Sequence, residues 1–300
     1  MSARFSVLAS GSSGNSSLLW TDRFGLLIDF GLGSRMIASR FRTIGVQWNT
    51  IHAAILTHTH GDHWRRDTLG LLLRNRVPLY CHIRHLDGMA SAMTEIQNLR
   101  NAGLLHFYEP QRPIELPNGF RCTPIEVAHD SFPTFAFRID DSDWSVGYAA
   151  DLGTWTDELV EAFREVNLLA IEFNHDEDME RNSNRPDHLI ERVLGDRGHL
   201  SNRQAAELLQ TLLERVEQIP IGHVVQLHLS RHCNVPALAV DAARQVLQAV
   251  GSDARIHTAT QDIVLPPIVV DEPAKRPTKL PVTRVRTKLR QPLLPGFEDE

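Results

Sequence analysis

Four residues with metal-binding side chains lie close together in the segment ILTHTHGDHWRRD, at residues 55–67. They are His58, His60, Asp62 and His63, and they directly follow the apolar run 53–56, which predicts a buried strand. Residues i and i+2 of a strand point to the same side, so His58 and His60 are expected to lie together. Gly61 then allows a turn that brings Asp62 and His63 back toward a second point nearby. Imidazoles with a carboxylate suit zinc, iron or manganese, and the segment therefore predicts a metal site at a strand end.

A metal site of this kind needs further ligands from other strand ends, and the sequence offers candidates in that context. They are His129 after the run 123–128, Asp151 after the run 145–150, and His228 after the run 224–227. Each is a ligand-type residue placed directly after an apolar run. Their common placement favours a metal site over a surface cluster of hydrogen-bonded polar groups.

Apolar periodicity predicts strands and helices in both halves of the chain. Strands are expected at 5–9, 16–20 and 26–29 as an antiparallel meander, and then at 53–56, 120–127, 135–139, 144–149, 168–173, 224–227 and 255–258. Helices are expected at 34–41, 84–99, 156–166, 185–193, 202–218 and 236–250. This mixed order predicts an α/β fold in which helices cover the outer faces of sheets.

Composition indicates an ordinary globular protein, with 42% hydrophobic and 23% charged residues. No apolar run reaches the ~20 residues that span a bilayer, and the segment MSARFSVLASGSSGN has no signal-peptide pattern. We therefore expect a cytoplasmic protein with no membrane association. The cysteines Cys81, Cys122 and Cys233 are too scattered for a disulfide framework. Cys81 and Cys122 are expected to be buried, whereas Cys233, in the run HLSRHCN, is left open.

The end of the chain has a different composition. Every lysine of the protein lies within residues 273–290, a segment with no acidic residue and several prolines. We expect a catalytic domain at residues 1–265 and a basic, proline-rich, disordered tail at residues 266–300. Near its end, Leu294 and Phe297 in QPLLPGFEDE loosely resemble peptides that dock on the bacterial sliding clamp. Contact with the clamp or with a repair protein is one hypothesis for this tail, and an ordinary chain end is the other.

With these ligands, the chain resembles the metallo-β-lactamase superfamily over residues 4–262, including Asp29 in LLIDFG. The resemblance implies a four-layer αββα sandwich with a dinuclear metal site at one sheet edge. It assigns His58, His60 and His129 to one ion, Asp62, His63 and His228 to the other, and Asp151 to a bridge between them. The ions would be zinc or manganese, with iron also possible, at a separation of ~3.5–4 Å with a shared hydroxide.

Four stretches, FSVLASGSSGNSSLLW, LLAIEFNHD, GDRGHLSN and LHLSRHCN, resemble the YycJ (WalJ) group within that superfamily. Members of this group are regarded as DNA exonucleases acting from 5′ ends, so the resemblance implies DNA, more than RNA, as the partner. It also implies a role in DNA repair or replication. The basic tail departs from the family core.

A similarity to ribonuclease Z implies an acid catalyst. In that enzyme a histidine of a Gly-His-Ser-Thr motif, oriented by a glutamate, protonates the leaving oxygen. The segment GHLSN places His199 at the analogous position, and Glu172 in AIEFN is the candidate orienting residue. His199, Glu172 and the ligand Asp62 are the expected catalytic residues. The alternative for His199 is a local hydrogen bond at a helix N-terminus.

Other polar residues are expected near the site. Ser230, Asn234 and His175 are the candidate substrate-binding residues, and the loop containing Ser12 and Asn15 either borders the cleft or is only a hairpin turn. Arginines close to candidate site loops either line a nucleic-acid groove or are solvated surface residues. They are Arg65, Arg66, Arg84, Arg181, Arg185 and Arg231.

Two other classes of function remain open from the sequence. The same ligands serve enzymes that hydrolyse small substrates, such as a thioester or a small or cyclic phosphodiester. A lactam is disfavoured because lactamases of this superfamily generally lack a bridging aspartate, whereas Asp151 is present. A non-catalytic binding protein is the remaining alternative, and the full ligand set argues against it.

Overall fold

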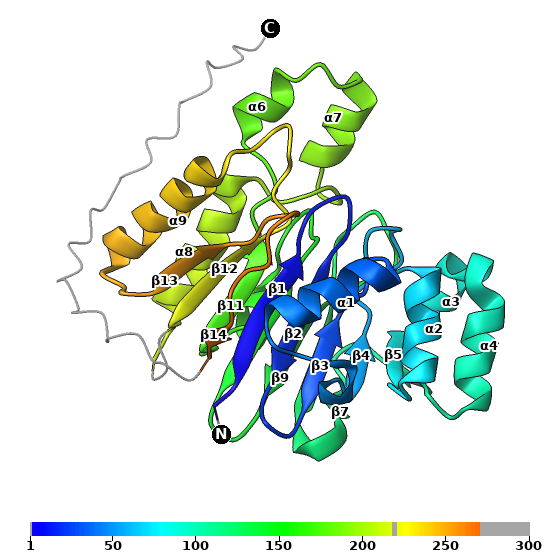
Figure 1. Cartoon of the computed structure of the whole chain (residues 1–300). Helices are drawn as coiled ribbons and strands as arrows, with labels where there is room; N and C mark the ends of the chain where they lie inside the picture. Colours follow the sequence, from blue (N-terminus) through cyan, green and yellow to red (C-terminus); the bar gives the residue numbers. More distant parts are fainter. Residues whose placement is uncertain (1, 218–220, 271–300) are drawn as a thin grey trace, which may run out of the picture.

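Two seven-stranded sheets face each other and helices cover their outer faces, which confirms the four-layer αββα arrangement (Figure 1). This computed structural model describes residues 2–217 and 221–270. The chain fills one sheet largely before the other, so the two halves of the sandwich correspond to the two halves of the sequence. One strand breaks this order, because the last strand returns to the edge of the first sheet.

The first sheet has the order β14-β1-β2-β3-β4-β5-β6. Its strands are β1 (Arg4–Ala9), β2 (Ser16–Trp20), β3 (Gly25–Ile28), β4 (Ala53–Ile55), β5 (Leu79–His82), β6 (Leu105–Tyr108) and β14 (Ile268–Val269). Strands β1 to β3 form the antiparallel meander expected from the sequence, and β3 to β6 run parallel.

The second sheet has the order β13-β12-β11-β10-β9-β8-β7. Its strands are β7 (Ile114–Glu115), β8 (Arg121–Val127), β9 (Thr134–Asp140), β10 (Ser145–Ala149), β11 (Leu168–Glu172), β12 (His223–Leu227) and β13 (Arg255–Thr258). Pairing is antiparallel from β7 to β10 and parallel from β10 to β13.

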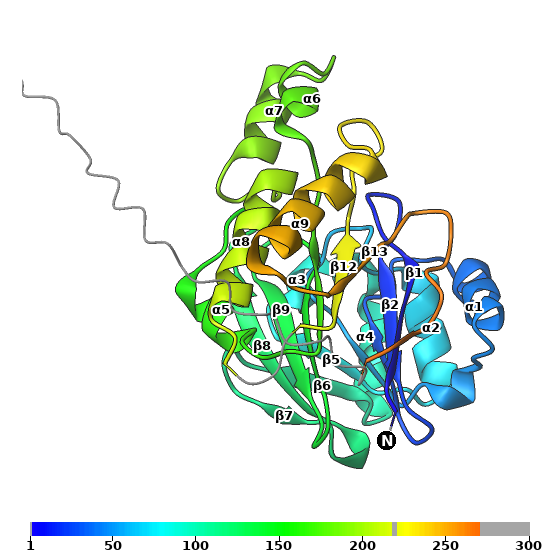
Figure 2. The same ribbon diagram turned by 90° about the vertical axis from the view of Figure 1, so that its left-hand side faces the viewer.

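Helices on the first sheet are α1 (Ser34–Thr43), α2 (Arg66–Arg74), α3 (His85–Gly88) and α4 (Met93–Asn101), and those on the second are α5 (Asp157–Ala162), α8 (Asn202–Glu214) and α9 (Pro236–Val250). Short 3-10 turns lie at Trp48–Thr50, Ala90–Ala92 and Pro117–Gly119. Helices α6 (Glu177–Arg181) and α7 (Asp187–Leu194) project beyond the sandwich (Figures 1 and 2). Within residues 2–217 and 221–270, no helix combines the length and apolar character needed to cross a membrane.

The core consists of three apolar layers. The central layer lies between the sheets and includes Phe5, Leu26 and Phe137. A second layer joins the first sheet to α1, α2 and α4, and a third joins the second sheet to α5, α8 and α9. A sheet buried on both faces explains why β1, β2, β3, β10, β11 and β12 read as almost continuous apolar runs.

Some elements differ from the sequence prediction. The helix expected at 84–99 is divided into α3, a 3-10 turn and α4, with Gly88 packed against Thr59 so closely that a side chain would not fit. Strands β5, β6, β7 and β14 were not predicted, and each is only two to four residues long. Periodicity alone is a weak guide to strands this short. Helix α2, of nine residues, was also not predicted.

The folded part extends past the boundary expected at residue 265. Strand β14 pairs antiparallel with β1, with Arg4 opposite Val269, and the Val270 amide donates to the Ala3 carbonyl at 2.9 Å. The predicted disordered tail and its clamp-like peptide lie, from residue 271 onward, outside the described residues and stay predictions.

The central layer should dominate the stability of the sandwich. Phe137 is fully buried between the sheets and packs its ring edge-on against Tyr108, with 5.7 Å between ring centroids. Replacing Phe137 with alanine should lower the free energy of unfolding by about 3–5 kcal/mol, because it leaves a cavity. Phe107→Ala is the control, since Phe107 is 41% exposed on β6 and should cost under ~1 kcal/mol. Urea titration measures both, and equal losses would contradict this description of the core.

Candidate metal centre

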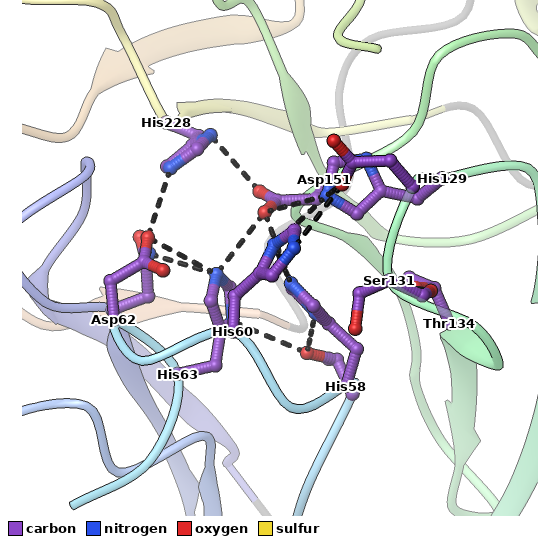
Figure 3. A network of polar contacts seen from close by, with 12 residues as sticks. His58, His60, Asp62, His63, His129, Ser131, Thr134, Asp151 and His228 are labelled. Atoms are coloured by element: carbon purple, nitrogen blue, oxygen red, sulfur yellow. Dashed lines mark hydrogen bonds and ion pairs between the residues drawn. The ribbon is translucent and has the colours of Figure 1, made fainter. Parts of the chain in front are cut away.

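Residues from four strand ends meet at one edge of the sandwich (Figure 3). In one group, His58 Nε2 lies 3.1 Å and His129 Nε2 lies 3.3 Å from His60 Nδ1. The Asp151 carboxylate oxygen Oδ2 is 3.4 Å from His58 Nε2 and 3.7 Å from His129 Nε2. These four residues hold ligand atoms within 4.8 Å of one another, a spacing at which a single ion reaches all of them with small adjustments.

A second group shares Asp151 with the first. His63 Nε2 lies 3.2 Å from Asp151 Oδ2 and 3.7 Å from Asp62 Oδ2. His228 Nε2 lies 3.5 Å from Asp62 Oδ2, while its Nδ1 is 3.0 Å from Asp151 Oδ1. Asp62, His63 and His228 form a compact triad of ligand atoms, and Asp151 stands between this triad and the first group. The structure thus brings together all seven residues predicted as ligands.

Most of these histidines have one ring nitrogen held by the protein and the other directed to the centre. His129 Nδ1 is 2.9 Å from the Gly198 carbonyl, and His58 Nδ1 is 3.0 Å from Thr57 Oγ1. In His60 the roles of the two nitrogens are exchanged. Its Nδ1 faces the centre, and its Nε2 lies 3.2 Å from Asp130 Oδ1. Outer partners of this kind fix ring orientation and tautomer at metal sites.

The buried carboxylate of Asp29 fixes the histidine-rich loop. Its Oδ1 accepts from the Thr57 amide at 2.8 Å, and its Oδ2 lies 2.7 Å from His63 Nδ1. Asn15 braces the same loop, because its Nδ2 lies 3.0 Å from Asp62 Oδ2 and 2.9 Å from His63 Nε2. The loop containing Asn15 is therefore part of the site and more than a hairpin turn.

The electrostatics differ between the two groups. Burial lowers the pKa of His58, and neighbouring His63 adds to this effect, so His58 is neutral, as a metal ligand must be. Burial also lowers the pKa of His63, but Asp151 and Asp29 outweigh it and raise the pKa well above its usual value. Burial raises the pKa of Asp151, but His228 and His63 overcome this and keep it well below the usual range, so Asp151 is ionised. The part of the centre formed by Asp62, His63 and His228 therefore attracts positive charge, such as a proton or a metal ion.

Two buried polar atoms at the centre, Asp151 Oδ1 and His228 Nε2, form no hydrogen bond of good geometry among the described residues. Their nearest polar neighbours are other members of the ligand clusters, with His228 Nδ1 3.0 Å from Asp151 Oδ1 and Asp62 Oδ2 3.5 Å from His228 Nε2. Buried polar atoms left unpaired are costly unless a ligand, ion or water meets them. Clustered imidazoles and carboxylates, among them a neutral His58 and an ionised Asp151, fit a divalent metal site.

The predicted acid pair stands directly beside this centre. His199 Nδ1 lies 2.7 Å from Glu172 Oε1, and Glu172 is fully buried and also accepts from the Leu152 and Leu200 amides, each at 3.1 Å. Burial lowers the pKa of His199, but the Glu172 carboxylate outweighs burial, so the pKa is raised above its usual value. His228 Nδ1 is 3.0 Å from the same Glu172 oxygen. Glu172 thereby links the metal centre to His199.

The predicted substrate-binding residues have separate locations. Ser230 lines a small pocket with His199 and His228. Asn234 is buried elsewhere, and its amide donates to the Phe173 and Asn174 carbonyls and pairs with Asn202. These bonds leave it no group for a substrate, which corrects that expectation.

His175 also departs from its predicted role. It is fully buried, forms a backbone bridge with Ser201, and does not line the pocket beside His199. Its ring therefore has no route to a substrate. Both His175 and Asn234 are next to the site in the sequence, but their side chains are buried.

Asp130 is a site residue that the sequence reasoning missed. Its carboxylate contacts His60 Nε2 and also pairs with Arg192 from α7. The available signal was its position next to the ligand His129, since a carboxylate beside a metal-binding histidine often orients another ligand.

Comparison with known proteins agrees with the geometry. A family model described as beta-lactamase superfamily domain matches residues 26–221. Exodeoxyribonuclease WalJ of Streptococcus pneumoniae serotype 2 (strain D39 / NCTC 7466) is 30% identical, over 88% of this chain and 96% of the relative. Exodeoxyribonuclease YycJ of Bacillus anthracis is 27% identical, over 84% of this chain and 91% of the relative.

A solved structure shares the fold. The metallo-β-lactamase fold protein YhfI of Bacillus subtilis superposes with a TM-score of 0.63 at 19% identity, covering 88% of this chain and 99% of that one. The αββα fold and a His/Asp cluster at its edge define a metal-dependent hydrolase. The chain belongs to the metallo-β-lactamase superfamily, in its YycJ-like group.

Gly31 offers a test of how closely the ligand loop is packed. A Cβ added to Gly31 would lie 1.7 Å from the Asp62 carbonyl oxygen, so the loop carrying Asp62 and His63 would have to move. Gly31→Ala should lower the free energy of unfolding by about 1–3 kcal/mol and reduce the divalent metal bound after purification. Gly33→Ala is the control, because its nearest new contact is an ordinary 3.7 Å. Metal analysis by mass spectrometry and urea titration measure the effects, and equal metal content in both variants would contradict the predicted displacement.

Proposed function

We propose that this protein is a phosphodiesterase that depends on two divalent metal ions and degrades DNA from the 5′ end. The observation that carries the proposal is the His199–Glu172 pair, 2.7 Å apart, beside the Asp151-centred ligand set. A hydrolase of this fold needs a positioned acid of this kind when its leaving group is an alkoxide. The curated relatives named exodeoxyribonuclease support DNA, more than RNA, as the substrate.

The ligand assignment follows the two groups of the centre. His58, His60 and His129 would hold one ion, Asp62, His63 and His228 the other, and Asp151 would contact both. Zinc or manganese is the expected metal, and iron is possible with the same ligands. Bound ions at these positions would supply a hydroxide nucleophile and positive charge for the phosphate oxygens.

The residues of the chain then control the leaving group. Glu172 holds Nδ1 of His199, so Nε2 is the nitrogen left to donate a proton to the substrate. A hydroxide oxygen would bond to phosphorus as the P–O3′ bond breaks, and O3′ would take the proton from His199. A nucleotide with a free 3′-hydroxyl departs, and the remaining strand carries a new 5′-phosphate.

The same pair disfavours the small-thioester alternative. A thiolate is a good leaving group, because a thiol has a pKa of about 8.5, so a thioesterase does not need a buried glutamate to keep a histidine protonated. Expulsion of an alkoxide gains roughly 10²–10⁴-fold from such an acid. A small or cyclic phosphodiester shares this chemistry and remains the alternative substrate. We place the enzyme in the cytoplasm, in repair or replication of chromosomal DNA.

Digestion of a duplex labelled at its 3′ end and phosphorylated at its 5′ end tests the activity directly. The purified protein with manganese should shorten the labelled strand stepwise from the 5′ end. His60→Ala should abolish digestion, since it removes a ligand at the centre. Protein that carries its metals and leaves DNA intact, while hydrolysing a small cyclic phosphodiester, would refute the nuclease proposal.

Two substitutions separate metal binding from acid catalysis. His199→Gln should lower the turnover rate by about 10²–10⁴-fold while the metal content stays unchanged, because His199 is not among the proposed ligands. Asp151→Ala should cost more activity and also metal, since Asp151 lies between both ligand groups. Metal analysis and single-turnover digestion check both variants. If Asp151→Ala kept the wild-type metal content and activity, the assignment of Asp151 as a shared metal ligand would be wrong.

A further inference from the structure

A small pocket beside the metal centre contains an arginine that the mechanism above does not use. The pocket has a volume of about 100 Å³, and His199 and His228 form part of its wall. Arg185, Ser12 and Ser230 supply further polar groups to the same wall. Arg185 lies between α6 and α7. The segment formed by these two helices projects beyond the sandwich (Figures 1 and 2).

A buried carboxylate fixes the Arg185 side chain. Its Nη1 donates to both oxygens of Glu180, at 3.0 and 2.9 Å, and its Nη2 donates to Ser230 Oγ at 3.4 Å. The Glu180 side chain is fully buried, whereas 25% of the Arg185 side chain is exposed. A guanidinium carries five N–H donors, so these bonds leave at least two donors for a ligand.

Stability alone does not account for this pair. Burying a carboxylate is costly, and replacing a buried ion pair by apolar residues is often neutral or stabilising. The pair fixes the position of the Arg185 guanidinium. Glu180 binds its Nη1 edge, and Arg185 forms part of the pocket wall. A guanidinium fixed in this way suits a phosphate, which it binds through parallel hydrogen bonds.

The size of the pocket limits what it holds. Its volume of about 100 Å³ is well below the ~300 Å³ of pockets that enclose whole small molecules. A larger pocket of about 730 Å³ is lined by His129 and by Phe132, whose ring is exposed. The guanidinium of Arg84 lies 4.6 Å from the centre of that ring, a surface suited to stacking nucleic-acid bases. The strand therefore has room to continue past Phe132, whereas the Arg185 pocket has room for a single end group.

We propose that the Arg185 pocket binds the 5′-terminal phosphate of the DNA strand. The inference rests on the proposed exonuclease function. The leaving oxygen near His199 is O3′ of the terminal nucleotide, so the 5′-phosphate of that nucleotide lies on the His199 side of the scissile bond. Each cleavage leaves a new 5′-phosphate on the remaining strand, which the pocket then receives in the next cycle.

Digestion of matched duplexes with a 5′-phosphate or a 5′-hydroxyl end tests the pocket. For the wild-type enzyme, KM should be about 10- to 100-fold lower with the phosphate end, as expected for charge-assisted hydrogen bonds. Arg185→Gln should bring the ratio of the two KM values close to one. The double variant Glu180→Gln/Arg185→Gln should do the same without leaving an unpaired buried carboxylate, and this separates loss of the ligand from misfolding.

Arg181→Gln is the matched control, since Arg181 is an exposed arginine on α6 outside the pocket wall, and it should keep the wild-type ratio. Equal KM values for both ends in the wild type would overturn the proposal, as would a ratio unchanged by Arg185→Gln, which would assign Arg185 to an internal phosphate. Failure of the wild type to digest either duplex would instead refute the proposed function. In that case, fluorescence anisotropy with labelled 5′-phosphate and 5′-hydroxyl oligonucleotides still decides whether the pocket selects a phosphate end.

Discussion

The hydrogen bonds of the Asp29 carboxylate hold together the part of the structure on which the metal centre depends. Asp29 is fully buried at the end of β3, in a left-handed backbone conformation with φ of 58°. A buried carboxylate is tolerated only where donors meet it, and here the Thr57 amide, the Thr57 hydroxyl and His63 all do so. One side chain thus sets the start of the histidine-rich loop and the direction of a ligand within it. His228 also has a positive φ, of 55°, so backbone strain occurs on both sides of the centre, as it often does at functional sites.

The two sheets bring these ligands together because their strands end at the same edge. Strands β4, β8, β10 and β12 each stop just before a ligand-bearing segment, and open sheets of this type carry their sites at the carboxyl ends of strands. The centre therefore lies across the interface between the sheets, and the central apolar layer determines the distance between its two sides. A change in sheet packing would alter ligand geometry even where no ligand is touched.

Much of this arrangement could be predicted from the sequence, and the exceptions have physical reasons. Ligands such as His129 and His228 directly follow long apolar strands, so both periodicity and residue type identify them. The pairing of His199 with Glu172 followed from a family resemblance, and the structure brings the two side chains into contact. Strands β5 and β6 were not predicted, because their four residues, LYCH and LHFY, form neither an apolar run nor a clear alternation.

Side-chain direction was the harder part to predict. Asn234 and His175 are near site residues in the sequence, but their side chains are buried in the interior. No local sequence pattern distinguishes a loop residue that faces a cleft from one that packs behind it. Asp130 pairs with Arg192 on α7, and Arg185 pairs with Glu180 on the neighbouring helix α6. Such pairs depend on how the segment that carries α6 and α7 is placed beside the site, which single-sequence periodicity does not encode.

The return of β14 to the edge of the first sheet has a consequence for the way the protein is made. A nascent chain leaves the ribosome from its N-terminus, at about 5–20 residues per second, so β1 emerges long before its partner near residue 268. Until then one edge of β1 has exposed amides and carbonyls, the kind of edge that other chains can pair with. The His228 amide, which donates to Ser10 Oγ at 2.7 Å, likewise reaches its partner late. Incomplete chains on a polysome therefore expose an incomplete ligand set until His228 has emerged and an unprotected strand edge until β14 has emerged.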